Sequence, residues 1–330
     1  MVVVQIEDLL SQRKFDLVRD RFDAVIYGHP LSAEDRVQEL DASGVEVWRY
    51  FNVFHVNLHA PEWSGYFADL YARMGAIQGF IPGARYRWFP SDLGPSPIID
   101  HRRYEVTQTL HATILDWASQ IQARRVILDV TFDSVHDWML WPGDSWPWPP
   151  EQHAAVNAGW GENMKALVAL QGAERPIAIN GSYKIEAPVV MFENQVWNDA
   201  RGQYTWPELF QRVTTGDVVP ILNVGHKHLD PVARARGELM TLAAWLLFDR
   251  AYLSIEMEPE ELDWVERIVE SGVDRFQPVH PLLNVFGSIW LRRGEVDGVI
   301  VDVRLDAVRG DALIVGLPPA AALILGLGSP

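Results

Sequence analysis

The chain has 330 residues, with 28 Lys and Arg against 44 Asp and Glu, and therefore a formal net charge of −16. This acidic surplus argues against a phosphate-binding basic surface, so we expect no nucleic-acid partner. Because 48% of the residues are apolar and 22% are charged, the chain can bury a large core and is not disordered. It has no cysteine, which excludes disulfides, thiolate metal sites and cysteine nucleophiles.

Neither end of the chain predicts a membrane segment. The first residues lack a basic segment and do not read as a signal peptide, so we expect a cytoplasmic chain unless a leader has been removed. The most apolar stretch, residues 312–327, is divided by Pro318 and Pro319. That pattern favours two short strands joined by a turn over a membrane-spanning helix.

Short β-rich segments alternate with helical segments along most of the chain. Strands are predicted at residues 22–27, 45–51, 86–89, 125–129, 176–180, 189–193, 218–224 and 251–256. Helices are predicted at residues 31–42, 61–74, 104–122, 152–170, 206–213 and 231–248. This alternation predicts an α/β fold in which parallel strands close into a (β/α)8 TIM barrel over residues 1–274.

One interval departs from this alternation, and the C-terminal part follows another pattern. Residues 181–188, between the fifth and sixth predicted strands, are too few for a helical crossover. Either that helix is missing or one strand is misassigned. Strands at residues 288–293, 298–303 and 312–315, joined by short turns, predict a small C-terminal antiparallel β subdomain over residues 275–330.

Tryptophan is abundant, and one proline-rich stretch holds a concentration of it. Residues 138–150 combine four Trp with four Pro, which is incompatible with a helix interior or a central strand. We expect a stiff loop whose aromatic rings can stack on the apolar faces of sugar rings. For any single Trp, packing in the core is the simpler alternative.

In a (β/α)8 barrel the active site lies at the carboxyl ends of the strands, so polar residues there are the candidates for chemistry. Asp129 ends the fourth predicted strand and Glu193 ends the sixth. Glycoside hydrolysis needs two such carboxyls, one as acid and one as nucleophile or base. The alternative is that Asp129 caps a helix or pairs with Arg49, and that Glu193 is a solvated loop residue. Residues expected to bind the carbohydrate substrate are Arg49, Tyr50, Asn52, Trp138, Trp141, Asn180, Trp197, His226, His228 and Glu256.

His226 and His228 form an H-x-H pair after the seventh predicted strand, a spacing that metal sites use. Because the chain has neither cysteine nor a second such pair, we expect these histidines to line the pocket, and we expect no metal and no cofactor. Two alternatives stay open: a metal-dependent hydrolase that uses both histidines, and a carbohydrate-binding barrel without a catalytic pair. The sequence contains no P-loop, no dinucleotide-binding glycine motif and no serine-hydrolase elbow.

Several short segments resemble a family of bacterial glycoside hydrolase barrels that is distantly similar to the alpha-galactosidase and endo-polygalactosaminidase barrels. These segments are residues 126–129 (Val-Ile-Leu-Asp), 160–164, 179–181, 191–193, 290–293 and 298–301. The related alpha-galactosidase-type barrels place the nucleophile at the end of strand four and the acid/base at the end of strand six. The resemblance therefore implies a retaining O-glycoside hydrolase of poly- or oligosaccharides, with Asp129 as nucleophile and Glu193 as acid/base. Asn180, which is not an acid, argues against an alpha-amylase-like arrangement.

Overall fold

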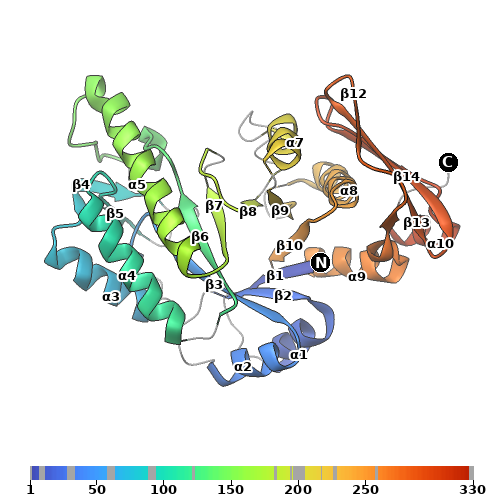
Figure 1. The fold of residues 1–330 in the computed structure, drawn as a ribbon, viewed down its shortest axis with the longest axis horizontal. Coiled ribbons are helices and arrows are strands. Elements are labelled where there is room, and N and C mark those ends of the chain that lie inside the picture. The colour runs from blue at the N-terminus through green and yellow to red at the C-terminus, as the bar shows by residue number, and fades with distance from the viewer. Residues whose placement is uncertain are drawn as a thin grey trace. The chain divides into compact units, whose positions relative to one another are not determined.

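The computed structural model describes residues 2–6, 12–27, 34–57, 64–87, 94–120, 123–181, 184–193, 195, 205–216, 218–225, 229–256 and 259–326. The chain forms two compact units. One unit is Ile6–Val190, and the other combines Met1–Gln5 with Met191–Pro330. Both contain parallel strands and helices together with a smaller antiparallel sheet, so the fold is mixed α/β (Figure 1).

The unit Ile6–Val190 is built on a parallel sheet. Its strands pair in the order β2 (Ala24–Tyr27), β3 (Glu46–Asn52), β6 (Arg125–Thr131) and β7 (Ile177–Gly181). They alternate along the chain with α1 (Gln12–Arg21), α2 (Glu34–Ala42), α3 (Ser64–Ala76), α4 (Tyr104–Gln120) and α5 (His153–Glu174). Strand β2 is buried along its whole length, as expected for a β-branched, apolar strand with both faces covered.

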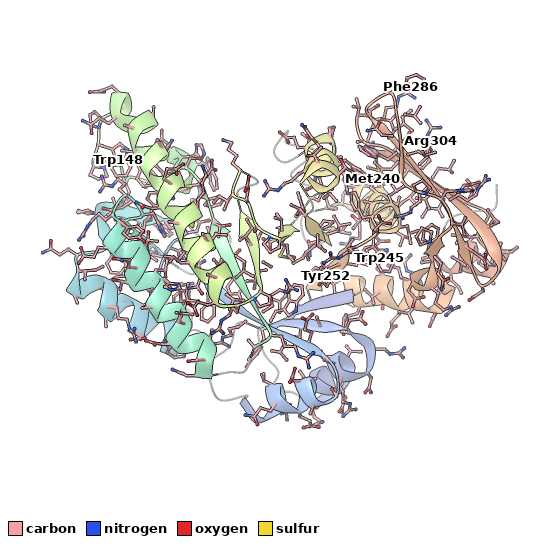
Figure 2. The ribbon with its side chains drawn as sticks, viewed as in Figure 1. Trp148, Met240, Trp245, Tyr252, Phe286 and Arg304 are labelled. Atoms are coloured by element: carbon pink, nitrogen blue, oxygen red, sulfur yellow. The ribbon has the colours of Figure 1, made fainter. Side chains whose placement is uncertain are left out.

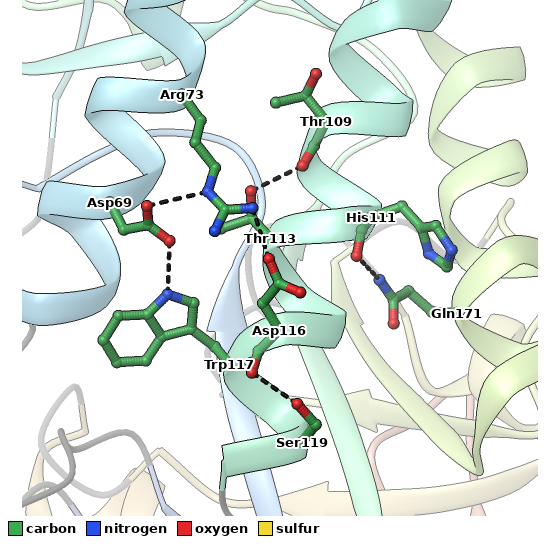
Figure 3. A network of polar contacts seen from close by, with 9 residues as sticks. All are labelled: Asp69, Arg73, Thr109, His111, Thr113, Asp116, Trp117, Ser119 and Gln171. Atoms are coloured by element: carbon green, nitrogen blue, oxygen red, sulfur yellow. Dashed lines mark hydrogen bonds and ion pairs between the residues drawn. The ribbon is translucent and has the colours of Figure 1, made fainter.

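Polar contacts between helices hold the layer formed by α3, α4 and α5 together (Figure 3). Asp69 on α3 accepts hydrogen bonds from the Trp117 indole of α4 at 2.8 Å and from Arg73 at 3.0 Å. Arg73 also donates to Asp116 of α4 at 2.7 Å. These bonds fix the side-by-side packing of α3 and α4 on the outside of the sheet.

The prediction that residues 86–89 form a parallel strand of the barrel is wrong for the residues that the structure describes there. Tyr86 ends β4 (Phe80–Tyr86), which pairs antiparallel with β5 (Ser96–Ile99) in a separate two-stranded sheet, while residues 88 and 89 lie outside the described residues. Strand β3 instead pairs directly with β6. The aromatic residues around position 86 do favour a strand, but its alternating burial suits a half-exposed antiparallel strand better than a buried parallel one.

The second unit has its own run of parallel strands, β1 (Val2–Ile6), β10 (Tyr252–Glu256) and β9 (Val219–Asn223), paired in that order. Its helices are α7 (Trp206–Thr215), α8 (Pro231–Leu247) and α9 (Pro259–Ser271). The start of α8 is fixed by Asp230, whose carboxylate accepts from two backbone N–H groups at 2.9 Å, with Pro231 in the first turn. The strands and helices predicted from the sequence do not include β1, α1 and α9.

The chain passes from one unit to the other at β8 (Val189–Phe192). Residues 184–188, which precede β8, form turns and bends and no helix, while residues 182 and 183 lie outside the described part. Within the described residues, the interval between β7 and β8 therefore fits the first of the two alternatives, the missing crossover helix.

The predicted antiparallel sheet of the C-terminal part is confirmed. Its strands run in the order β11 (Gln277–Pro278), β13 (Ile289–Val296), β14 (Val299–Asp306) and β15 (Asp311–Val315), and β12 (Leu283–Val285) also pairs with β13. One face is buried, and from it Arg292 donates to the Leu247 carbonyl at the end of α8 at 2.6 Å.

The prediction of two strands within residues 312–327 is half wrong. The first apolar run forms β15, but the second forms a helix, α10 (Pro319–Ile324). Pro319 occupies the first turn of this helix, where its missing N–H costs nothing, and an alanine-rich run follows. Among the described residues, no helix is long and apolar enough to cross a lipid bilayer.

Candidate active site

Asp129 lies near the carboxyl end of β6, and its carboxylate faces hydrogen-bond donors from both neighbouring strands. Nδ2 of Asn180 on β7 donates to Oδ1 at 2.7 Å, and the Tyr50 hydroxyl on β3 donates to Oδ2. The strand register pairs Asn52 with Asp129, so Tyr50, two residues earlier, projects from the same face. Only 7% of the Asp129 surface is exposed. The fold thus holds this carboxylate in one orientation.

Burial raises the pKa of Asp129 to about 6, because a charged carboxylate is costly away from water. Hydrogen bonds from Tyr50, from Asn180 and from the Val130 backbone N–H oppose this effect by stabilising the charged form. Asp129 is therefore ionised at neutral pH, yet it takes up a proton more readily than an exposed aspartate does. A carboxyl with these properties suits proton transfer or nucleophilic attack.

The backbone on either side of this carboxylate is held in uncommon conformations. Val130, directly after Asp129, has φ +59°, a left-handed value that costs a β-branched residue about 1–3 kcal/mol. The pairing of β6 with β7 shifts register between Leu128 and Thr131, so the ladder is irregular on both sides of Val130. Such strain persists where the surrounding structure imposes it, and it gathers at functional sites.

A glycine completes this arrangement on β7. Gly181 follows Asn180 and has φ +146°, and a Cβ at this position would lie 2.6 Å from the backbone nitrogen of Thr131. The Thr131 hydroxyl donates to the Asn180 carbonyl at 2.9 Å. Sequence reasoning missed this feature. A glycine that ends a strand next to a polar residue is the signal that could have revealed it.

Arg49 points away from this carboxylate. Neighbouring residues of a strand face opposite sides, so Arg49 and Tyr50 on β3 project in opposite directions. The Arg49 guanidinium lies 5.7 Å from the ring centres of both Tyr27 and Phe51. Burial lowers its pKa to about 10. The alternative of an Asp129–Arg49 ion pair is not found among the described residues, and neither side chain shifts the pKa of the other.

Asn52 lies beside Asp129, but its side chain serves the loop that follows β3. Its Oδ1 accepts from the backbone N–H groups of Phe54 at 3.0 Å and His55 at 3.1 Å, and its Nδ2 lies 3.1 Å from Nε2 of His55. Burial lowers the pKa of His55 to about 3, so this imidazole is neutral. These contacts give Asn52 a part in shaping the loop next to the site.

The Trp- and Pro-rich stretch divides into buried and exposed rings. Trp146 and Trp148 stack at 5.2 Å and are buried, and the Arg102 guanidinium lies 4.5 Å from the Trp148 ring centre. Trp148 projects among the side chains beside α5 (Figure 2). Trp138 is 51% exposed, and Trp141 is half-buried. Trp138 is therefore the ring of this stretch that is available to a ligand.

The same stretch packs against the strained residue after Asp129. Val130 belongs to an apolar cluster with Trp146, Trp148, Phe54 and Trp160. The Trp160 indole also donates to the Phe132 carbonyl at 3.1 Å, which fixes the chain just beyond the irregular part of the ladder. Packing of this loop therefore supports the backbone that aims Asp129.

The remaining predicted site residues belong to the second unit or lie outside the described part. Glu193 is half-buried in the turn after β8. Glu256 ends β10, where its backbone pairs with Gln5, and its side chain lies outside the described part. Trp197, His226 and His228 also lie outside the described residues. Among the residues that are described, no group of three or more His, Asp or Glu is arranged to hold a metal.

The raised pKa of Asp129 predicts how stability depends on pH. The folded chain binds this proton more tightly than the unfolded chain, so folding loses about 3 kcal/mol as the pH rises from about 4 to above 6. Asp129→Asn removes that loss because an amide does not titrate, and the amide can still accept from Asn180 and donate to the Tyr50 oxygen. Urea unfolding should show the variant gaining about 3 kcal/mol over wild type between pH 4 and pH 7.5. A pH-independent difference between the two proteins would contradict the raised pKa.

Comparison with known proteins gives a fold and no sequence family. No family model matches the chain, and no curated protein matches it. The alpha-glucosyl transfer enzyme XgtA matches with a TM-score of 0.52 at 11% identity, over 93% of this chain and 90% of that one. Alpha-galactosidase AgaA from Geobacillus stearothermophilus, in complex with raffinose, matches with a TM-score of 0.50 at 10% identity, over 92% of this chain.

The chain spans about half the length of that alpha-galactosidase, 47%. At these identities the likeness concerns the fold alone. The fold of this chain is thus similar to that of carbohydrate-active enzymes. In this chain, parallel strands alternate with helices, and an antiparallel sheet lies in the C-terminal part.

Proposed function

We propose that this chain is a retaining glycoside hydrolase that cleaves O-glycosidic bonds of a poly- or oligosaccharide. The observation that carries the proposal is the buried Asp129 carboxylate, held by Tyr50 and Asn180 at the end of a parallel strand beside strained backbone. The likeness in fold to carbohydrate-active enzymes supports it. The proposal includes a closed (β/α)8 barrel over residues 1–274, with residues 275–330 as an appended subdomain.

In the proposed mechanism Asp129 is the nucleophile and Glu193 is the acid/base. An oxygen of Asp129 attacks the anomeric carbon while the bond to the leaving oxygen breaks and Glu193 protonates that oxygen. Water then attacks the same carbon, Glu193 takes its proton, and the bond to Asp129 breaks. This two-step mechanism requires the two carboxyls to lie about 5–5.5 Å apart.

Tyr50 and Asn180 are positioning residues in this scheme. Each donates one hydrogen bond to a different oxygen of Asp129, and a carboxylate oxygen has a second lone pair left for attack. Their donation also favours the ionised form that a nucleophile needs. In this proposal the exposed ring of Trp138 stacks on the apolar face of a sugar.

The proposal is tested by a panel of α- and β-linked 4-nitrophenyl glycosides. Wild type should release nitrophenol from at least one of them, and proton NMR should show a first-formed sugar with the anomeric configuration of the substrate. A first-formed sugar with the opposite anomeric configuration would rule out Asp129 as the nucleophile. Binding of glycans without release of sugar from any substrate would favour the carbohydrate-binding alternative.

The pH profile of the same reaction carries a further prediction. Because Asp129 must be ionised to attack and its pKa is raised to about 6, kcat/KM should fall as the pH drops below about 6. The fall should approach tenfold per pH unit. An acid limb centred near pH 4, the ordinary value for aspartate, would contradict the role given to burial at this carboxyl.

A further inference from the structure

The outer face of the C-terminal antiparallel sheet carries a cavity of about 280 Å³ that the proposed reaction does not use. Its lining residues are Ser288, Ile289, Arg304, Asp306, Val308 and Arg309. Strand register pairs Ile289 with Asp306 and Leu291 with Arg304. Residues two apart on a strand share a face, so Ile289, Arg304 and Asp306 project from the same side of the sheet. The opposite side is buried.

Two arginines line this cavity, and the side chain of one of them has no partner among the described residues. The Arg304 side chain is exposed and makes no hydrogen bond or ion pair with any described residue. Arg309 is 77% exposed at its side chain and lies 3.8 Å from Asp306. Together with Asp306 the cavity carries a formal charge of +1, on a chain whose net charge is −16. Arginine binds carboxylates through two parallel hydrogen bonds, so an unpaired Arg304 suits an anionic ligand.

Asp306 makes the cavity suitable for hydroxyl groups as well. Its Oδ1 accepts from the backbone N–H groups of Val308 and Arg309, both at 3.1 Å, and its side chain is largely buried. Within the part of the chain that the structure describes, its Oδ2 has only the Arg309 contact at 3.8 Å. This fixed acceptor would repel an apolar carboxylate that offers no donor, whereas a sugar hydroxyl can donate to it. The Ser288 side chain adds a hydroxyl to the same wall.

An exposed aromatic ring stands next to this wall. Phe286 is 93% exposed, and it occupies the turn between β12 and β13, two residues before Ser288. Its backbone is in the left-handed region, with φ +56°. Phe286 and Arg304 project from the same end of this sheet (Figure 2). Phenylalanine gains no stability in such a place, but its flat face can pack against the C–H groups of a sugar ring.

We propose that this cavity is an accessory binding site for an acidic sugar unit of a glycan, a pyranose that bears a carboxylate. Arg304 and Arg309 bind the carboxylate, Asp306 and Ser288 bind ring hydroxyls, and Phe286 packs against the apolar face of a ring. The site lies outside the residues assigned to hydrolysis. Its existence therefore does not depend on the proposed mechanism.

Isothermal titration of the full chain with a tetrasaccharide of galacturonic acid tests this site. Wild type should bind with a Kd below about 1 mM, and Arg304→Gln should weaken binding at least tenfold. Phe286→Asn, which keeps a residue tolerant of the left-handed turn, should weaken it severalfold. The neutral galactose tetrasaccharide should bind at least tenfold more weakly than the acidic one.

Arg293→Gln is the matched control. Arg293 is on the same face and loses the same charge on substitution, but in wild type it is paired with Asp302 at 2.7 Å. The Kd of the Arg293→Gln variant for the acidic tetrasaccharide should stay within twofold of the wild-type Kd. Equal weakening by Arg293→Gln and Arg304→Gln, or equal binding of the acidic and neutral tetrasaccharides, would overturn the proposal. Asp129→Asn should bind the acidic tetrasaccharide like wild type, so loss of hydrolysis and loss of this site are told apart.

Discussion

Replacing Asp129 by Asn should lower kcat/KM for the best glycoside substrate by about 10⁴-fold, a loss of about 5.4 kcal/mol of transition-state stabilisation. The amide preserves the volume of the carboxyl and can keep both hydrogen bonds, to Tyr50 and Asn180. It cannot attack an anomeric carbon, so the loss is chemical and not structural. Steady-state kinetics on a 4-nitrophenyl glycoside measures it.

Two further variants separate chemistry from structure at this position. Asp129→Gly opens space for a small external nucleophile, and azide should restore turnover as a glycosyl azide with the opposite anomeric configuration. Tyr50→Phe removes one hydrogen-bond donor and no reacting atom, so it should lower kcat/KM far less than Asp129→Asn does. It should also raise the pKa of Asp129, which moves the acid limb of the pH profile to higher pH. Activity of Asp129→Asn close to that of wild type would remove Asp129 from the reaction.

Replacing Gly181 by Ala should destabilise the fold by about 3 kcal/mol or more. At φ +146° an L-residue is strained, and the added Cβ would meet the Thr131 backbone nitrogen at 2.6 Å and its hydroxyl oxygen at 2.7 Å. The closest of these atoms belongs to the backbone and cannot rotate away, so the strands must separate. Because Asn180 precedes Gly181, activity should fall as well. Urea unfolding at pH 7 measures the change.

Gly159→Ala is the matched control. Gly159 lies on the exposed side of α5, and a Cβ there meets nothing within 4 Å. The same substitution should therefore stabilise the chain by about 0.5–1 kcal/mol, because alanine favours the helix. If Gly181→Ala were as stable as wild type, the close approach of β6 and β7 beside Asp129 would not exist in solution.

The alternation of strands and helices was predictable, but two errors in it cancel. The sequence analysis missed β1, a short valine-rich run at the start of the chain, and counted a parallel strand at residues 86–89. Of the parallel strands in the described residues, β6 is still the fourth in chain order, so Asp129 keeps the strand number from which its role was inferred. Burial pattern, not composition, separates the half-exposed β4 from the buried strands.

The candidate site was predictable where it depends on strand ends and not where it depends on backbone strain. Polar residues at strand ends identified Tyr50, Asp129 and Asn180, which the structure brings together. The alternation of strand faces already implied that Arg49 and Tyr50 point apart, so that only Tyr50 shares the face of Asp129. No propensity predicts a valine with φ +59°, because the packing of the surrounding cluster imposes that conformation.

The proposal that Asp129 is the nucleophile is tested most directly by trapping the glycosyl-enzyme. Wild type is incubated with the 2-deoxy-2-fluoro glycosyl fluoride of the sugar it hydrolyses, and the intact chain and its peptides are weighed by mass spectrometry. We predict a mass gain of one fluorosugar, located on Asp129, with hydrolysis lost in parallel. A label on any other residue, or no label on an active and fully inhibited enzyme, would contradict the account.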